Sequence, residues 1–193
     1  VYIIDSARSP VLKARNAPGP FSPSELAVRT SRCLLLRQSF SAAELDEVIV
    51  GCASPSADET NIGRVIGLRI GTGDKVPAWT VMRNCASGMQ ALDSALLNIQ
   101  SGRSHLVLAA GTDALSHALS QWNAAKSTGQ KLQALRSFRP VYLAPVIGLL
   151  KGLKDPVIGI SMGQTAENLA WKFNITRQEM DAYSARSHQR TIE

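Results

Sequence analysis

The stretch that decides the fold of this chain runs from residue 78 to residue 100 and reads AWTVMRNCASGMQALDSALLNIQ. Residues 78–82 form a short run that suits a strand. The apolar side chains after it recur at helical spacing, and they are Met89, Leu92, Ala95, Leu96 and Ile99. The stretch therefore predicts a strand over 78–82, a tight turn, and a buried helix over 89–100 that stops at Gly102.

Strands and helices alternate on both sides of this stretch. Residues 1–5, 48–50 and 106–110 are apolar runs of strand length, and the last is continuous, which indicates a strand covered on both faces. Helices are predicted from a capping box at Ser22–Glu25 to about Gln38, over 61–70, over 162–171, and from Thr176 onward. The alternation predicts an α/β layered fold with a mostly parallel or mixed sheet.

Composition narrows the class of protein. Of the 193 residues 45% are hydrophobic, which indicates a folded chain, and no apolar run approaches the roughly 18 residues of a membrane span. The N-terminus lacks the pattern of a secretion signal, so we expect a protein of the cytoplasm, or of an organelle matrix in a eukaryote. The composition changes near residue 119, which predicts an N-terminal domain over 1–119 and a second domain over 120–193 that departs from it.

The formal net charge is +6, and one basic region lies in the second predicted domain. Its members are Lys126, Lys131, Arg136, Arg139, Lys151 and Lys154. These bases are dispersed and aromatic residues are sparse, so a nucleic-acid surface is disfavoured. Two interpretations stay open: a solvated basic loop, or a surface that meets a phosphate-bearing cofactor.

Three cysteines are too few and too scattered for a disulfide framework or a metal site. Cys33 on a helix and Cys52 at a strand end fit small buried residues. Cys85 is different, because it lies where a strand turns into a helix. Unpaired amides at a helix start favour a thiolate and can hold a developing oxyanion, and the small Ser87 and Gly88 leave room for an acyl chain.

Four ordered segments make the chain similar to the N-terminal part of the thiolases. They are the nucleophile segment 77–92, the opening segment 5–10, the segment 102–116 after the helix, and Ser161-Met-Gly-Gln-Thr-Ala-Glu-Asn168. The resemblance implies a layered thiolase fold and transfer of acyl groups between coenzyme A thioesters through a cysteine. It also implies coenzyme A as co-substrate, no covalently bound cofactor, and a homodimer or tetramer.

The resemblance assigns roles to individual residues. Cys85 matches the nucleophile, Met162 matches a residue that shapes the acyl pocket, and Ser161 stands where acetoacetyl-specific members often have His. With Ser87 and Gly88, these residues form the predicted substrate site. Ser161 and the region 138–155 favour the broad-chain branch related to the β subunit of the fatty-acid oxidation complex.

The chain also departs from the family pattern. The Gly-His-Pro, Cys-x-Gly and Asn-Glu-Ala-Phe motifs of thiolases do not occur in it, and His117 is the one histidine that could approach Cys85. We therefore expect about half of an enzyme, inactive alone. Two alternatives remain at this point: a non-catalytic binder of acyl-CoA, and a condensing enzyme like the ketoacyl-carrier-protein synthases.

Overall fold

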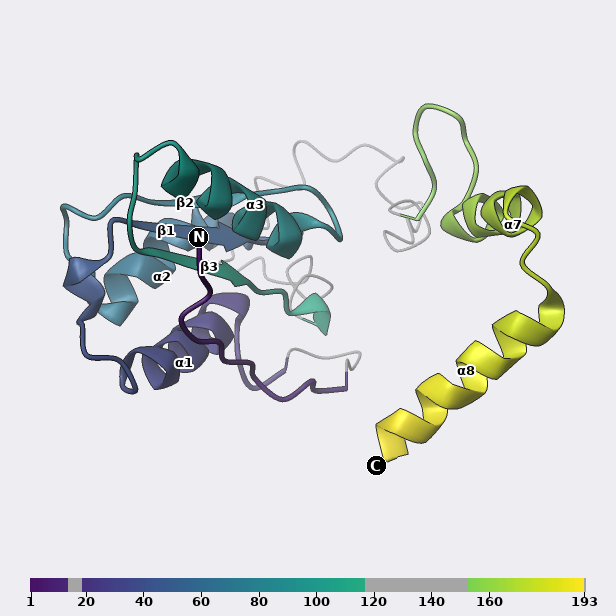
Figure 1. Cartoon of the computed structure of the whole chain (residues 1–193), viewed down its shortest axis with the longest axis horizontal. Helices are drawn as coiled ribbons and strands as arrows, with labels where there is room; N and C mark the ends of the chain where they lie inside the picture. Colours follow the sequence, from purple (N-terminus) through teal and green to yellow (C-terminus); the bar gives the residue numbers. More distant parts are fainter. Residues whose placement is uncertain (14–18, 117–152, 193) are drawn as a thin grey trace, which may run out of the picture. The chain divides into compact units, whose positions relative to one another are not determined.

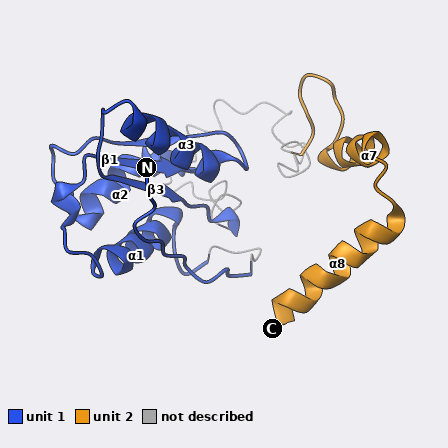
Figure 2. Ribbon diagram, viewed as in Figure 1, with its two compact units in different colours: residues 1–128 blue, residues 129–193 orange. Residues whose placement is uncertain are grey.

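The computed structural model of this chain describes residues 1–13, 19–116 and 153–192. The chain divides into two compact units, residues 1–128 and 129–193, which Figure 2 shows in different colours. The first unit contains the sheet and the Cys85 turn, and the described part of the second contains two helices. Each unit is described by itself below.

Three parallel strands form the sheet of the first unit. They are β1 (Glu47–Gly51), β2 (Ala78–Val81) and β3 (Val107–Gly111), in the order β2-β1-β3. In the register of the sheet, Ile49 of β1 lies beside Trp79 of β2 and Ala109 of β3. The expected parallel α/β sheet is confirmed, and β1 is its fully buried centre.

Helices cover both faces of this sheet (Figure 1). Val48 and Val50 of β1 pack with α1 (Pro23–Leu35) and α2 (Ile62–Ile70), whereas Ile49 packs against α3 (Ser87–Gln100). Side chains of a strand alternate between its two faces, so this one strand contributes to both apolar layers. The result is the layered arrangement that the alternating pattern predicted.

Local signals explain where the helices begin and end. The Ser22 hydroxyl accepts from the Glu25 amide at 3.2 Å, and the Glu25 carboxylate accepts from the Ser22 amide at 2.8 Å, which completes the predicted capping box of α1. Helix α2 ends at Gly71, whose φ of 97° is a left-handed conformation that glycine adopts easily. Two short 3₁₀ turns, η1 (Ala42–Glu44) and η2 (Ala57–Glu59), connect the elements.

The strand predicted over residues 1–5 is wrong. These residues form no strand, and Tyr2 and Ile3 are exposed. Asp5 instead accepts hydrogen bonds from Arg37 at 3.0 Å and Gln38 at 2.7 Å, just beyond the end of α1. The Arg37 guanidinium holds the pKa of the Asp5 carboxyl below its usual value, and the Ser6 amide adds to this effect.

The prediction of a buried α3 was only half right. The buried side chains of α3 are Ser87, Ala91 and Ala95. The large apolar side chains Met89 and Leu92 are exposed to 69% and 48%. Short side chains let the helix axis lie close to the sheet, and this contact decides which face of α3 is buried.

The second unit contains α7 (Met162–Lys172) and α8 (Arg177–Ile192), both expected from the sequence. Thr176 caps α8, because its hydroxyl accepts from the Glu179 amide at 3.3 Å. The predicted domain boundary at residues 119 and 120 lies outside the described residues and stays a prediction. Within the described part of the chain, no helix is both long and apolar enough to cross a membrane.

Candidate active site

Cys85 lies in the turn between β2 and α3, which we call the 82–86 turn. It is exposed, and Ala86 after it is the N-cap residue of α3. The sequence prediction of a cysteine between a strand and a helix start is therefore confirmed in its geometry. An exposed thiol in this position is accessible to an incoming electrophile.

The backbone of the 82–86 turn has a left-handed residue directly before the thiol. Asn84 has a φ of 48°, and asparagine is among the few side chains that tolerate this region. The conformation reverses the chain direction between β2 and α3 within a few residues. Sequence analysis did not single out Asn84, although an asparagine between a strand and a helix is a recognised signal for such a conformation.

Ser87 joins the two sides of this turn. Its hydroxyl accepts a hydrogen bond from the Arg83 amide at 2.8 Å and donates one to the Asn84 carbonyl at 2.7 Å. The side chain is only 3% exposed. The Ser87 oxygen therefore bonds to the backbone on the N-terminal side of Cys85, and its predicted contact with substrate remains a prediction.

The start of α3 has open hydrogen-bond donors. No side chain caps this end; the Ser87 amide donates to the Asn84 carbonyl and the Gln90 amide to the Ala86 carbonyl. Among the described residues, nothing accepts from the amides of Gly88 and Met89 between them. Such donors, with the partial positive charge of a helix start, suit a negatively charged oxygen.

Gly88 itself lies against the sheet. A methyl group in place of its hydrogen would be 3.7 Å from the Cα atom of Gly111, at the end of β3. The first turn of α3 thus contacts the carboxyl end of the sheet without an intervening side chain. The predicted role of Gly88 beside a substrate stays a prediction.

The other two cysteines occupy different surroundings from Cys85. Cys52 is fully buried, and burial together with the charge of Asp113 raises the pKa of its thiol to about 11. This confirms the prediction that Cys52 is a small buried residue. The same prediction for Cys33 is wrong, because α1 presents Cys33 to solvent and buries Ala27, Val28 and Ser31 instead.

Asp113 follows β3 and organises the loop after β1. Its carboxylate accepts from the Ser54 amide at 3.0 Å, the Ser54 hydroxyl at 2.8 Å and the Ala53 amide at 3.2 Å, and the Cys52 thiol lies 3.6 Å away. The carboxylate thereby ties together the segments that follow β1 and β3.

Ser161 and Met162 lie in the second unit, at the start of α7. The Ser161 hydroxyl accepts from the Gln164 amide at 3.2 Å and caps the helix, and Met162 is about half exposed. A backbone bridge between Lys154 and Ser161 closes the preceding turn. Both residues are thus adjacent at a helix N-terminus, and their predicted contact with the acyl group stays a prediction.

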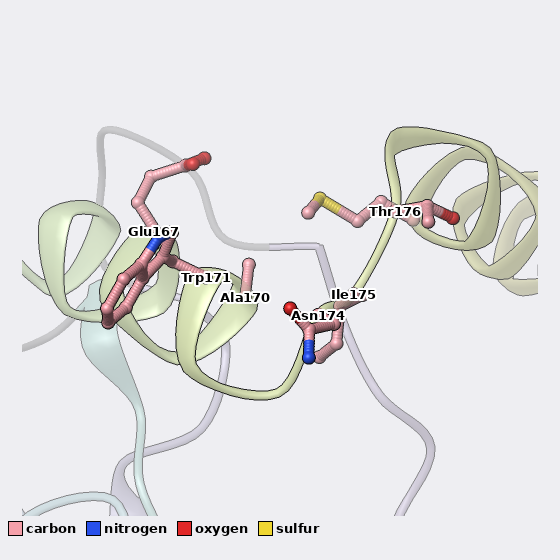
Figure 3. A pocket seen from close by; sticks show the side chains of 7 residues that line it. Glu167, Ala170, Trp171, Asn174, Ile175 and Thr176 are labelled. Carbon is pink, nitrogen blue, oxygen red and sulfur yellow. The ribbon is translucent and has the colours of Figure 1, made fainter.

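The second unit also has a shallow pocket of about 470 Å³ between α7 and α8, which sequence analysis did not anticipate. Figure 3 shows Glu167, Ala170 and Trp171 on α7, followed by Asn174, Ile175 and Thr176 in the connection to α8. The lining is mostly apolar, and Trp171 is 84% exposed. It contains no nucleophilic thiol.

Several candidates of the sequence analysis lie outside the described residues. They are His117 and the bases Lys126, Lys131, Arg136, Arg139 and Lys151. Their predicted roles therefore stay predictions. Within residues 1–13, 19–116 and 153–192, no group of three or more His, Cys, Asp or Glu side chains could hold a metal ion.

Comparison with protein families gives a match over the whole chain. Residues 1–193 match the model of the thiolase N-terminal domain. The β subunit of the human mitochondrial trifunctional enzyme is 31% identical over 97% of this chain and 41% of its own length. The β-ketoadipyl-CoA thiolase of Pseudomonas knackmussii is 31% identical over 98% of this chain and 47% of its own length.

The chain also matches solved structures over most of its length. The acetyl-CoA acetyltransferase of Bacillus anthracis matches with a TM-score of 0.68 and 34% identity, over 88% of this chain and 41% of that one. Human mitochondrial 3-ketoacyl-CoA thiolase in complex with CoA matches with a TM-score of 0.69 and 29% identity, over 89% of this chain and 42% of that one. The chain therefore spans less than half the length of these proteins.

Proposed function

The chain belongs to the thiolase family, and from this premise we propose that it supplies the nucleophile of an acyltransferase that acts on coenzyme A thioesters. The observation that carries the proposal is the place of Cys85, exposed in the turn between β2 and the uncapped start of α3. Membership of this family leaves the ketoacyl-carrier-protein synthase alternative without support. The non-catalytic binder remains as the alternative that experiment must exclude.

The proposed chemistry has two steps. The Cys85 sulfur attacks the 3-keto carbon of a 3-ketoacyl-CoA, the bond between C2 and C3 breaks, and acetyl-CoA leaves after its C2 carbon takes a proton. The thiol of a free coenzyme A then attacks the acyl-cysteine thioester, and the bond between the acyl carbon and the Cys85 sulfur breaks. The proton of the coenzyme A thiol passes to the cysteine sulfur, and a shortened acyl-CoA leaves. The reverse sequence condenses two acyl-CoA molecules.

The described residues supply one requirement of this chemistry, hydrogen-bond donors for the oxygen that becomes negative. The open amides of Gly88 and Met89 at the start of α3 can donate to an oxygen that becomes negative when Cys85 attacks. The chemistry also requires a base and a further hydrogen-bond donor to the thioester oxygen. The resemblance assigns the base to a second cysteine and the donor partly to a histidine, both in motifs that do not occur in this sequence. The chain alone is therefore expected to lack turnover.

The substrate is proposed to be a 3-ketoacyl-CoA, handled by an enzyme of the broad-chain branch. Support comes from Ser161, which stands where acetoacetyl-specific members often have His, and from the similarity to the trifunctional enzyme β subunit. The human relative is named as mitochondrial, which supports an organelle matrix if the source is eukaryotic. Coenzyme A as co-substrate is supported by the CoA complex of the human thiolase.

We further propose a homodimer that pairs through β2. This strand lies at an edge of the described sheet, and its Trp79, Thr80 and Val81 are only partly buried. An edge strand with apolar side chains is a site for pairing with another chain. Light scattering of the natural full-length protein at micromolar concentration should give at least a dimer, and a monomer would contradict the proposal.

The decisive experiment traps the acyl-enzyme. The natural full-length protein is incubated with a 3-ketoacyl-CoA in the absence of free coenzyme A, and its peptides are analysed by mass spectrometry. We expect the mass of the acyl group on the peptide that contains Cys85. Cys85→Ser should abolish the adduct, whereas Cys33→Ser, a matched change at the other exposed cysteine, should leave it intact.

Two outcomes would contradict the proposal. An acyl group on Cys33 or Cys52 would assign the chemistry to another thiol. Binding of acyl-CoA without any covalent adduct or turnover would establish the non-catalytic alternative.

A further inference from the structure

Three glycines from distant parts of the sequence meet beneath the Cys85 turn. Gly51 ends β1, Gly111 ends β3, and the two are direct partners in the sheet register. A methyl group built on Gly51 would lie 2.3 Å from the backbone carbonyl of Ser87 and 2.5 Å from the amide nitrogen of Gly88. We call this meeting of Gly51, Gly88 and Gly111 the glycine contact.

Space, not backbone conformation, favours glycine at Gly51 and Gly111. None of the three glycines has a positive φ, unlike Gly71 and Gly102 elsewhere in the chain. Real Cβ atoms essentially never approach other heavy atoms as closely as a Gly51 methyl would approach Ser87. A methyl on Gly111 would lie 3.2 Å from the Cα atom of Gly88, a milder overlap.

The glycine contact acts on the part of α3 that holds the nucleophile turn. The backbone atoms that Gly51 approaches belong to Ser87 and Gly88. Ser87 in turn bonds through its hydroxyl to the Arg83 amide and the Asn84 carbonyl. Cys85 lies between these bonded residues, so a shift of Ser87 away from the sheet moves the thiol as well.

Hydrogen bonds hold the strand ends against which α3 packs. The Thr112 amide donates to the Gly51 carbonyl at 3.0 Å, and the Cys52 amide donates to the Val81 carbonyl at 3.2 Å. The Asp113 carboxylate holds the amides of Ala53 and Ser54 directly beyond them. The overlap that a methyl group at Gly51 creates is therefore relieved by movement of α3, because the strand ends are more constrained than the start of the helix.

We propose that Gly51 and Gly111 are positioning residues for Cys85. By allowing backbone-to-backbone contact, they set where the start of α3 and the thiol lie relative to a bound acyl group. The proposal deepens the function proposed above and rests on it for its catalytic consequence, although its effect on the position of the thiol can be measured independently.

The test compares two pairs of matched variants in the natural full-length protein. Gly51→Ala is paired with Gly63→Ala, whose methyl would lie 2.2 Å from the Trp79 carbonyl, an equally severe overlap between α2 and β2. Gly111→Ala is paired with Gly67→Ala, whose methyl would lie 3.0 Å from the Ala78 Cβ atom. Each control places the same added group in the same sheet domain but away from α3.

The cysteines of the chain provide internal readouts. Alkylation at neutral pH, followed by peptide mapping, gives the labelling rate of Cys85 relative to that of exposed Cys33. Labelling of buried Cys52 reports unfolding. We expect Gly51→Ala to change the Cys85-to-Cys33 ratio while Cys52 stays protected, Gly111→Ala to change it less, and both controls to keep the wild-type ratio.

Turnover provides the second readout. Because displacement of a reacting group by about 1 Å can cost about 10²-fold, Gly51→Ala should lower kcat by about 10- to 100-fold with a smaller change in KM. The control variants should lose melting temperature but retain kcat. If Gly51→Ala does not fold, the milder Gly111→Ala must still show a lowered kcat with Cys52 protected.

The outcomes separate this inference from the proposed function. Unchanged labelling ratio and kcat in the folded Gly111→Ala and Gly51→Ala variants would overturn the positioning role, as would equal losses in the controls. A changed labelling ratio in a protein whose wild type has no acyl-transfer activity would support the positioning role and refute the proposed function.

Discussion

Replacement of Ser87 by alanine tests most directly how the Cys85 turn is held. The Ser87 hydroxyl makes two short hydrogen bonds, from the Arg83 amide and to the Asn84 carbonyl, and is 3% exposed. The Asn84 carbonyl keeps the Ser87 amide as a donor at 3.1 Å after the change. The Arg83 amide loses the partner that the structure gives it.

The size of the effect follows from this difference between the two bonds: the Asn84 carbonyl keeps another donor, whereas the Arg83 amide loses its acceptor. Removing the donor bond to Asn84 costs about 1 kcal/mol, and leaving a buried amide unpaired costs about 1–3 kcal/mol. For a fully buried amide the two losses add to about 2–4 kcal/mol. Because this bond is only partly buried, we expect the free energy of unfolding to fall by about 2 kcal/mol. Because the turn carries the proposed nucleophile, kcat should fall by about 10- to 100-fold.

The assay combines denaturant unfolding with steady-state kinetics on a 3-ketoacyl-CoA, using the natural full-length protein. The matched control is Ser94→Ala on the same helix, where the hydroxyl accepts one longer hydrogen bond, 3.3 Å, from the flexible Gln90 side chain. Its cost should stay below about 0.5 kcal/mol. A Ser87→Ala protein with wild-type stability and a raised KM alone would refute our reasoning and favour the predicted substrate contact of Ser87.

Two further predictions concern the cysteines and the pH dependence of stability. Mild alkylation at neutral pH should label Cys85 before Cys33 and leave Cys52 unlabelled, because burial raises the pKa of the Cys52 thiol to about 11; first labelling of Cys33 or Cys52 would contradict this. The amides of His105 and Leu106 lower the pKa of Asp46, so its contribution to stability is present above its unfolded-state pKa and is lost as the pH falls through the lower folded value. The stability difference between wild type and Asp46→Asn should therefore shrink below about pH 4, and a difference that stays constant as the pH falls would contradict this.

The sequence predicted well those elements whose limits are set by local chemistry. Ser22 with Glu25 and Thr176 with Glu179 form helix starts from neighbouring residues, and Gly71 ends α2 by its own conformation. The strand β1 was predictable because all five of its residues are buried, and a continuous apolar run is the pattern of such a strand. These signals need no knowledge of distant contacts.

Predictions that depended on distant partners were less successful. Residues 1–5 have the composition of a strand, but a strand needs a neighbour, and Asp5 instead bonds to Arg37 and Gln38. The periodicity of α3 was correct, whereas its buried face was not, since hydrophobicity gives more weight to Met89 and Leu92 than to Ala91. Close packing against a sheet favours the smaller side chain.

The same limitation applied to the candidate site. Cys85 could be predicted because its segment resembles a known nucleophile and its flanking elements are local. The contact of Gly51 and Gly111 with the start of α3 could not, because it joins residues up to 60 positions apart in a sequence where any of 14 glycines could have a conformational role.

Small residues around Cys85 serve two physical requirements at once. At Gly51 and Gly111 the lack of a side chain lets the backbone of α3 lie directly on the sheet ends, which fixes the turn. At Gly88 it also leaves the helix start uncovered, so that its amide remains open to an oxygen of a substrate.

A larger residue at Gly88 would meet only ordinary contacts, the nearest at 3.7 Å, so stability alone does not demand glycine there. Gly88→Ala should therefore fold normally, and any loss of acyl transfer by that variant would come from crowding of the reacting oxygen and not from displacement of Cys85.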